Sequence, residues 1–284
     1  MITDIQPSAT CWSEYAPLRR VLLCPPQFMR IDEVINHVQT RYIEDGIDTQ
    51  LALEQHQELI ATLQRYHVDV ILLEPDRDYP DQVFTRDIGF TIGNHLFVSQ
   101  MEESIRKGEE QILTRWLTDQ QIPYQFIRSG SIEGGDVMID RDTVWIGDSG
   151  RTSRRAMAEI QQELPHMEVL PLSVPVKYLH LDCILNILSP TEALIFPSAF
   201  EEEDLQRLAS RYELIEVDET EQFTLGTNIL SIGNRTILSL PVNPRVNEAL
   251  RQRGYTVVEV DLSEIIKSGG SFRCSTLPLI RGEE

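Results

Sequence analysis

The sequence has no long hydrophobic run, no cysteine pairs at metal-binding spacing and no basic leader. No stretch of its 284 residues approaches the ~18 apolar residues of a membrane-spanning helix. Residues 1–17 lack the basic start and apolar centre of a signal peptide. Because the four cysteines show no Cys-x-x-Cys spacing, we expect no metal site, no disulfide framework and a cytoplasmic location. They are Cys11, Cys24, Cys183 and Cys274.

Basic residues are also scarce, and the formal net charge is −20. A nucleic-acid-binding protein needs a basic stripe for phosphates, so we exclude that class of partner. An acidic protein can steer a cationic small molecule toward itself, although the same charge also serves solubility. With 41% apolar residues, the chain can bury one large core or two small ones.

One module, a hairpin followed by a helix and a strand, recurs along the chain. Short apolar strands around turn-forming pairs predict four hairpins, at 88–98, 137–146, 183–196 and 228–240. Amphipathic periodicity predicts the helices that follow them, at 103–118, 152–164, 201–211 and 244–253. The closing strands are expected at 123–127, 168–172, 213–217 and 256–260.

A helix at 49–66 and a strand at 68–73 form the rest of a fifth module that lacks its hairpin. The first strand, 20–24, and a terminal strand, 271–277, can supply that hairpin between them. A repeat completed by the two chain ends implies a ring. We therefore expect an α/β protein, a five-bladed propeller of α/β units around a pseudo-fivefold axis. Residues 1–284 would form this single domain, closed by its N- and C-terminal strands.

Polar residues recur near the starts of these hairpins. Asp87, Glu133, His180, Asn228 and Cys274 follow one another at intervals of 46, 47, 48 and 46 residues. Equivalent positions in the repeats of a ring point toward a common centre, so we expect the five to meet at one mouth of it. Taken singly, each has a structural explanation, such as a surface acid, a core histidine or a buried cysteine.

The residue types indicate a chemistry. A thiolate at Cys274 is a strong nucleophile, and an imidazolium or a bound cation lowers the pKa of such a thiol. Carboxylates around it would hold a planar cation with several N–H donors, and a guanidinium fits. The acids would also repel a free thiolate until the cation arrives. Asp182 lies two residues after His180 and is expected on the same side of a strand.

Four motifs resemble those of the guanidino-group-modifying enzymes of the pentein fold. They are Phe84-Thr-Arg-Asp87, Glu133-Gly-Gly-Asp136, His180-Leu-Asp182 and the glycine-flanked Cys274. That superfamily includes arginine deiminase, arginine dihydrolase, dimethylarginine dimethylaminohydrolase, agmatine deiminase and the amidinotransferases. The resemblance covers nearly the whole chain and implies no cofactor.

The resemblance implies a role for each matching position. Cys274 would attack the guanidinium carbon and form a covalent adduct, and His180 would protonate the leaving amine and then activate water. Glu133, Asp87 and Asp182 would hold guanidinium nitrogens. Three further positions would bind substrate: Arg106 and Arg151, as partners of an amino-acid carboxylate, and Asn228.

Two acids point to different substrates. Asp182 resembles the deiminases and amidinotransferases and favours an unsubstituted guanidinium, whereas Asp81, also a substrate-binding candidate, resembles the dimethylarginine hydrolases. Arg273 either depresses the pKa of the Cys274 thiol or faces solvent.

Three functions stay open at this stage: a hydrolase acting on arginine or an N-methylated arginine, an amidinotransferase, and a non-catalytic binding protein. The short chain favours the hydrolase. The leaving group and the oligomeric state, a monomer or a homo-oligomer, are not given by the sequence.

Overall fold

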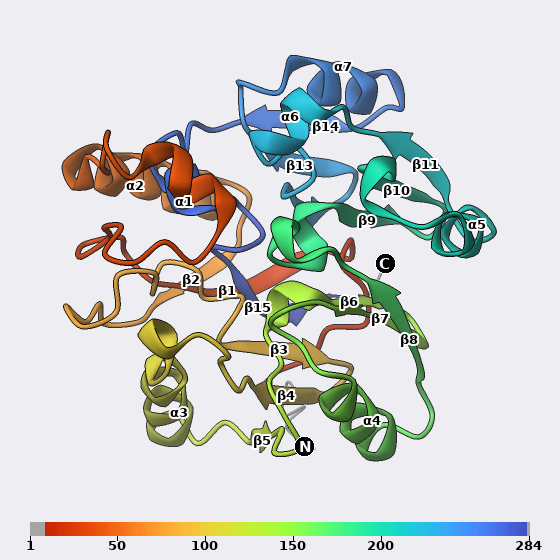
Figure 1. Cartoon of the computed structure of the whole chain (residues 1–284), viewed down its shortest axis with the longest axis horizontal. Coiled ribbons are helices and arrows are strands. Elements are labelled where there is room, and N and C mark those ends of the chain that lie inside the picture. Colours follow the sequence, from red (N-terminus) through yellow and green to blue (C-terminus); the bar gives the residue numbers. More distant parts are fainter. Residues whose placement is uncertain (1–8, 283–284) are drawn as a thin grey trace, which may run out of the picture.

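The computed structural model describes residues 9–282, so residues 1–8 and 283–284 of the expected 1–284 domain lie outside the described residues. The described chain contains five three-stranded sheets. In Figure 1 these sheets lie around the middle of the molecule, with most of the helices toward its periphery. The α/β class expected from the sequence is confirmed.

Every sheet has the same make-up, an antiparallel pair with a third strand added in parallel. In four sheets the strands follow one another along the chain, as the repeated module predicts. These are β3 (Gly89–Ile92), β4 (His95–Val98) and β5 (Gln125–Phe126); β6 (Val137–Asp140), β7 (Thr143–Asp148) and β8 (Glu168–Ser173); β9 (Leu185–Ser189), β10 (Glu192–Ile195) and β11 (Glu213–Glu216); β12 (Leu230–Gly233), β13 (Thr236–Ser239) and β14 (Thr256–Glu259).

The fifth sheet joins the two ends of the described chain. Strand β1 (Leu18–Leu23) pairs antiparallel with β15 (Leu277–Arg281) and parallel with β2 (Asp69–Leu72). This pairing was expected, but the position of the terminal strand was wrong by several residues. Residues 271–276 form turns instead, because Ser275 N–H donates to the Ser271 carbonyl and Thr276 N–H to that of Arg273. The turn lets Cys274 leave the plane of the sheet.

Seven α-helices connect the strands in the described chain. They are α1 (His37–Tyr42), α2 (Thr49–Arg65), α3 (Glu109–Asp119), α4 (Arg154–Glu163), α5 (Glu202–Ala209), α6 (Glu219–Phe223) and α7 (Pro244–Gln252). Helix α6 was not predicted. The helix expected at 103–118 is split, because Gly108 adopts a left-handed conformation between the 3₁₀ turn η1 (Ser104–Arg106) and α3. No helix of residues 9–282 is both long and apolar enough to cross a bilayer.

The hydrophobic core lies between the helices and the sheets. Leu59 and Leu63 of α2 pack in one buried cluster with Val21 and Leu23 of β1. The same cluster contains Cys274 and Phe272, so the loop that carries the thiol is anchored in the main core. This packing fixes the position of the loop against which the polar residues converge.

Candidate active site

Cys274 sits on the turn before β15 and is 2% exposed. Asn228 holds this turn, since its Oδ1 accepts hydrogen bonds from the backbone N–H groups of Ser271 and Cys274, each at 3.2 Å. Its Nδ2 lies 3.1 Å from the Cys274 Sγ. Asn228 was expected to bind substrate, but its polar atoms are engaged by the turn and the thiol. These contacts give Asn228 a structural role in holding the turn and the thiol.

Asp182 approaches the same sulfur from the neighbouring module. Its Oδ2 lies 3.6 Å from the Cys274 Sγ and accepts a hydrogen bond from Arg273 Nη1 at 2.9 Å. The expectation that Asp182 lies on a strand was wrong, because Leu181–Cys183 forms the 3₁₀ turn η4, in which the Cys183 N–H donates to the His180 carbonyl. Arg273 does not face solvent either, since it is 1% exposed and also pairs with Glu14 at 3.1 Å.

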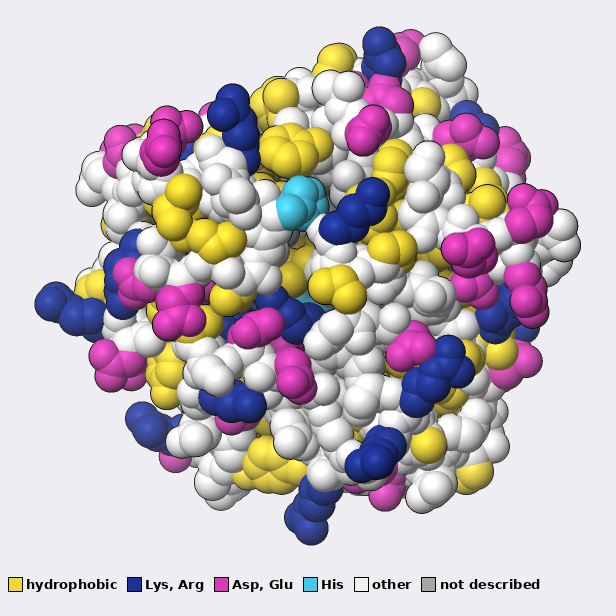
Figure 2. Space-filling model, in the orientation of Figure 1, with side chains coloured by type: hydrophobic (Ala, Val, Ile, Leu, Met, Phe, Trp, Pro, Cys, Tyr) yellow, Lys and Arg dark blue, Asp and Glu magenta, His cyan; other side chains and the backbone are white. Residues whose placement is uncertain are grey.

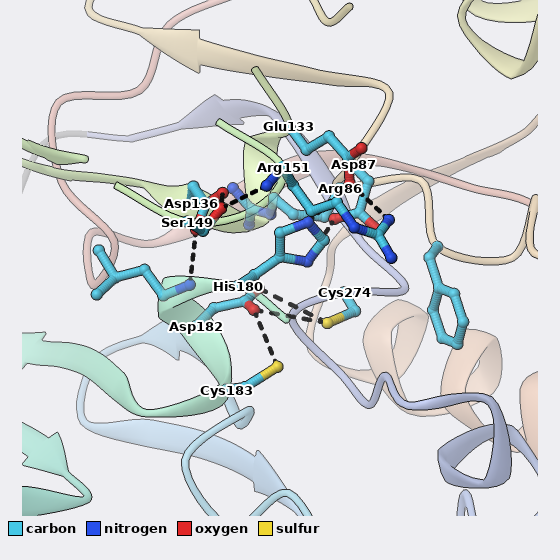
Figure 3. Close-up of polar contacts among 12 residues, drawn as sticks. Arg86, Asp87, Glu133, Asp136, Ser149, Arg151, His180, Asp182, Cys183 and Cys274 are labelled. Carbon is cyan, nitrogen blue, oxygen red and sulfur yellow. Dashed lines mark hydrogen bonds and ion pairs between the residues drawn. The ribbon is translucent and has the colours of Figure 1, made fainter. Parts of the chain in front are cut away.

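The thiol of Cys274 is protonated in the free protein. A hydrogen bond with Cys183, then burial and the charge of Asp182, raise its pKa well above the ordinary value. Cys183 is 3% exposed, and its Sγ lies 3.7 Å from Asp182 Oδ1 (Figure 3). No spacing rule in the sequence indicated Cys183 as a neighbour of the nucleophile, because only the η4 turn directs its side chain toward Asp182.

His180 lies between two carboxylates (Figure 3). Its Nε2 is 2.7 Å from Glu133 Oε2, and its Nδ1 is 3.6 Å from Asp87 Oδ1. Burial would lower the pKa of His180, but the charge of Asp87 and the hydrogen bond with Glu133 raise that pKa to about 10. Burial would raise the pKa of Glu133, but the hydrogen bond and charge of His180 lower it to about 2. The pair is therefore an imidazolium and a carboxylate at neutral pH.

The two glycines of the Glu133 motif permit this close approach. A Cβ at Gly135 would lie 2.8 Å from Asp87 Oδ1 and 2.8 Å from His180 Nδ1, closer than real Cβ atoms come. Asp136, at the end of the motif, accepts a hydrogen bond from the Leu181 N–H at 2.9 Å. Asp136 thereby holds the η4 turn. The sequence showed the motif without assigning this residue a role.

The two arginines expected to bind a carboxylate differ in their surroundings. Arg106 Nη1 lies 2.6 Å from Asp87 Oδ2, and its Nε and Nη2 lie 3.1 and 2.8 Å from the carboxylate of Glu109. Most donors of Arg106 are thus engaged by acids. Arg151 Nη2 donates to the Ile35 carbonyl at 2.8 Å, while its buried Nη1 has no hydrogen-bond partner among the described residues. Arg151 also lies near two acids, with its Nε 3.4 Å from Glu103 Oε1 and its Nη1 3.7 Å from Glu133 Oε2, but these ion pairs are longer than those of Arg106.

A small pocket lies among these groups. Five of the candidates line it, namely Cys274, Asp87, Asp81, Arg106 and Arg151, together with Ile35, Asn36, Phe84, Leu179, Ser268, Gly269 and Gly270. The segments around Asn36 and Leu179 were not expected at the site. Figure 2 shows a small hollow near the middle of this face, with basic and histidine side chains inside it.

The remaining candidates lie around the pocket rather than in its lining: Glu133, His180, Asp182 and Asn228. Two buried atoms beside the pocket, Asp87 Oδ1 and His180 Nδ1, have no hydrogen-bond partner in the described structure. Asp81 accepts a hydrogen bond from Ser268 Oγ at 2.7 Å, and burial raises the pKa of its carboxyl. A buried acceptor without a partner is costly, so Asp87 Oδ1 favours a ligand with its own N–H donors.

Asp87, Glu133 and His180 also place one potential ligand atom each within 4.8 Å of one another. Such a cluster can in principle hold a metal ion. In this arrangement the His180 imidazolium has no free lone pair to offer, because both ring nitrogens carry protons and face the two acids. An organic cation can bind to the same acids, because it needs no lone pair from His180.

Comparison with known proteins agrees with the arrangement of motifs. Residues 25–281 match a family profile described as N,N dimethylarginine dimethylhydrolase, eukaryotic. The uncharacterized protein YkgA of Bacillus subtilis is 50% identical over 282 residues, which cover 99% of both chains. The N(G),N(G)-dimethylarginine dimethylaminohydrolase of Mycobacterium tuberculosis is 30% identical over 264 residues, 92% of this chain and 86% of that protein.

Among solved structures, the N-terminal domain of ArgZ, a cyanobacterial arginine dihydrolase, superposes with a TM-score of 0.86 at 27% identity. The match covers 92% of this chain and 98% of that one. This ArgZ domain was solved bound to substrate in a cysteine-to-serine mutant, and also covalently bound to a reaction intermediate. The chain therefore belongs to the dimethylarginine dimethylaminohydrolase family, within the guanidino-group-modifying pentein superfamily.

Proposed function

We propose that the protein is a cysteine-dependent hydrolase that acts on the guanidino group of arginine or of an N-methylated arginine. One observation carries the proposal: the nucleophile Cys274 and the acids Asp81 and Asp87 line a single pocket, with the His180 imidazolium beside it. Arginine-type substrates are cations whose N–H groups match these carboxylates. The hydrolases among the relatives, and the covalent intermediate of ArgZ, support the same chemistry.

Substrate binding and ionisation of the thiol are coupled in this proposal. Asp87 and Asp182 raise the pKa of Cys274 in the free protein. A guanidinium bound between these acids would offset their charge and lower the pKa of the thiol. The proton would then leave as the cation enters, so that the reactive thiolate forms only in the loaded site.

The reaction would proceed in two halves. The Cys274 sulfur forms a bond to the guanidinium carbon, and His180 donates a proton to the nitrogen that leaves as ammonia or an alkylamine. The neutral His180 then takes a proton from water, whose oxygen adds to the same carbon and displaces the sulfur. The product carries a ureido group, and Cys274 and His180 return to their starting states. Glu133 stabilises the imidazolium through its hydrogen bond of 2.7 Å.

We also infer that the five sheets form one closed pentein ring in a single domain. The support is the common strand order of all sheets and the pairing of β1 with β15. In such a ring the hairpin starts of successive modules face one centre. This geometry explains why residues spaced 46 to 48 positions apart meet at one pocket.

Product analysis tests the function. We expect turnover of arginine, monomethylarginine or asymmetric dimethylarginine, with release of ammonia, methylamine or dimethylamine and formation of citrulline. If two ammonias and ornithine appear from arginine, the enzyme is a dihydrolase, which remains within the proposal. Transfer of the amidine to an added amine such as glycine would instead identify an amidinotransferase.

Agmatine provides a control for the carboxylate partner. It has the guanidinium of arginine but no carboxylate, so it would lose the interaction with Arg151 and turn over far less efficiently. Equal kcat/KM for agmatine and the best amino-acid substrate would refute that role of Arg151. Absence of turnover for every guanidino compound would refute the enzyme and favour a binding protein.

A further inference from the structure

A second cavity, here called the back cavity, is lined by a separate set of residues. Arg86, Arg281 and Glu14 are the charged residues in its lining, and Thr91 and Ser13 are among the polar ones. No residue lines both the back cavity and the pocket around Cys274. Two consecutive residues face different cavities: Arg86 lines the back cavity, and Asp87 lines the pocket around Cys274.

Arg86 is buried without a counter-charge. Arg86 is 4% exposed. The one hydrogen bond of its Nε is long, at 3.5 Å to the Arg273 carbonyl. Its buried Nη2 has no hydrogen-bond partner, and no ion pair of Arg86 occurs among residues 9–282. A buried cation is strongly unfavourable unless it is paired, so this guanidinium calls for an anion.

The other charged groups nearby do not supply that anion. Arg281 is also buried and donates from Nη1 to the carbonyls of Ala16 and Ser231, with no carboxylate partner in the described structure. Arg273 is the cation that pairs with the acids present, Glu14 and Asp182. Three guanidinium groups therefore face two carboxylates, which leaves one positive charge uncompensated.

The ionisation of these groups agrees with this excess. Burial and then the charge of Arg273 lower the pKa of Arg86 to about 10. The Arg86 guanidinium is therefore still a cation at neutral pH, although a neighbouring positive charge disfavours that state. Burial alone would raise the pKa of Glu14, but Arg273, Arg86 and Arg281 lower it to about 2. Glu14 is therefore already ionised and offers no further negative charge.

We propose that the back cavity binds one small monovalent inorganic anion of the halide class, held by the free N–H groups of Arg86 with Arg281 on the same wall. One uncompensated positive charge calls for one negative charge. Glu14 in the lining repels a dianion such as phosphate or sulfate more strongly than a monoanion, and the Thr91 hydroxyl is not free for an oxyanion because it donates to the Pro278 carbonyl. Chloride meets this requirement of charge.

The anion would stabilise the catalytic loops from behind. Arg86 and Arg273 precede Asp87 and Cys274 directly in the chain, so both loops carry a cation on one side and a catalytic group on the other. A bound halide would remove the repulsion between these two guanidinium groups. Because it binds the folded state only, it would raise the melting temperature with its concentration.

Bromide soaking of crystals of the wild-type protein tests the site directly. We expect an anomalous bromide peak in the back cavity, within hydrogen-bond distance of Arg86. A cavity without a bromide peak, or one that takes up sulfate instead, would overturn the proposal. This measurement needs no variant, so it does not depend on how well a substituted protein folds.

Thermal unfolding tests the site in solution. At constant ionic strength, replacing gluconate, which is too large for the cavity, with chloride should raise the Tm of the wild type by about 2 °C or more. Arg86→Met should lose this response, while Arg65→Met, a change at an exposed arginine, should keep it. An unchanged chloride response in Arg86→Met would contradict the proposal, whereas failure of product formation would leave it intact and refute only the proposed function.

Discussion

The two oxygens of Asp182 face different partners at the centre of the site. Oδ2 accepts from Arg273 and lies 3.6 Å from the Cys274 Sγ, and Oδ1 lies between the sulfurs of Cys274 and Cys183. A guanidinium carbon in position for attack lies about 3–3.5 Å from the sulfur. We therefore propose that one nitrogen of the substrate faces Asp182.

This position predicts a preference for arginine over asymmetric dimethylarginine. A dimethylated nitrogen has no N–H left to donate to Asp182 Oδ1, and a missing hydrogen bond to a buried acid costs about 1–3 kcal/mol. Asp182→Ala should reduce the ratio of kcat/KM for the two substrates by about tenfold or more. Equal loss on both substrates would show that Asp182 acts on the thiol alone. A wild-type preference for dimethylarginine would instead support the substrate class indicated by Asp81.

Cys183 provides a test of how the thiol is kept protonated. Its hydrogen bond is the largest cause of the raised pKa of Cys274, so Cys183→Ala should lower that pKa. At a given pH between about 7 and 9, a lower pKa gives more thiolate and faster alkylation. The measurement is the pH profile of iodoacetamide labelling of the Cys274 peptide. Cys24→Ala, which removes another buried thiol, should leave the profile unchanged; an identical profile in Cys183→Ala would refute the role of this hydrogen bond.

At this scale the sequence predicted residue types better than their contacts. The regular intervals predicted that Asp87, Glu133, His180 and Cys274 lie near one another. The pairing of Arg106 with Glu109, by contrast, depends on the turn at Gly108 and on burial, neither of which a spacing reveals. The position of Asn228 behind the thiol likewise depends on the turn at 271–276.

Among the elements, Arg273 connects three segments that are distant in the chain. Its guanidinium donates to Glu14 before β1, to Asp182 in η4 and to the Val137 carbonyl of β6. Each partner is buried. The catalytic turns are therefore held to the sheets by one buried network of charges.

Removing this cation should destabilise the fold strongly. Arg273→Met would leave Glu14 and Asp182 buried without their partner, and breaking a buried pair costs about 3–5 kcal/mol. Urea unfolding should show this loss, whereas Arg251→Met, which removes a surface pair with Glu259, should change the free energy of unfolding by about 0–1 kcal/mol. Similar losses in the two variants would contradict the structural role of Arg273.

The elements also show where prediction from sequence ends. The hairpins were placed correctly because alternating apolar residues and turn pairs are local signals. The terminal strand was placed too early because residues 271–276 contain no glycine or proline that would mark a turn. Their turn is fixed by long-range hydrogen bonds to Asn228, and no local pattern shows these.

Across the whole molecule, the net charge of −20 bears on association with a cationic substrate. Figure 2 shows acidic side chains spread over the face that contains the hollow. Electrostatic steering predicts that kcat/KM for arginine falls several-fold as ionic strength rises from about 0.01 to 0.5 M. Potassium gluconate is the salt of choice because it does not occupy the back cavity. Alkylation of Cys274 by neutral iodoacetamide should not fall in parallel; a kcat/KM independent of salt would refute steering.

The number of modules and the pairing of the chain ends were also predictable at this scale. Both predictions depend only on the number of repeats, so small errors in the bounds of a strand do not affect them. The back cavity was not predictable, because Arg86 stands in a motif whose next residue, Asp87, lines the pocket around Cys274. Only the structure separates the side chains of Arg86 and Asp87 into different cavities.

The central claim is that Cys274 becomes covalently attached to the guanidino carbon of the substrate. Rapid acid quenching of the wild-type enzyme during turnover of arginine, followed by peptide mass spectrometry, tests this most directly. The account predicts a mass increment on the Cys274 peptide that equals the substrate less ammonia, and no increment in Cys274→Ser, which should bind substrate without turning it over. Turnover without any adduct on Cys274, or substantial activity in Cys274→Ser, would contradict the account.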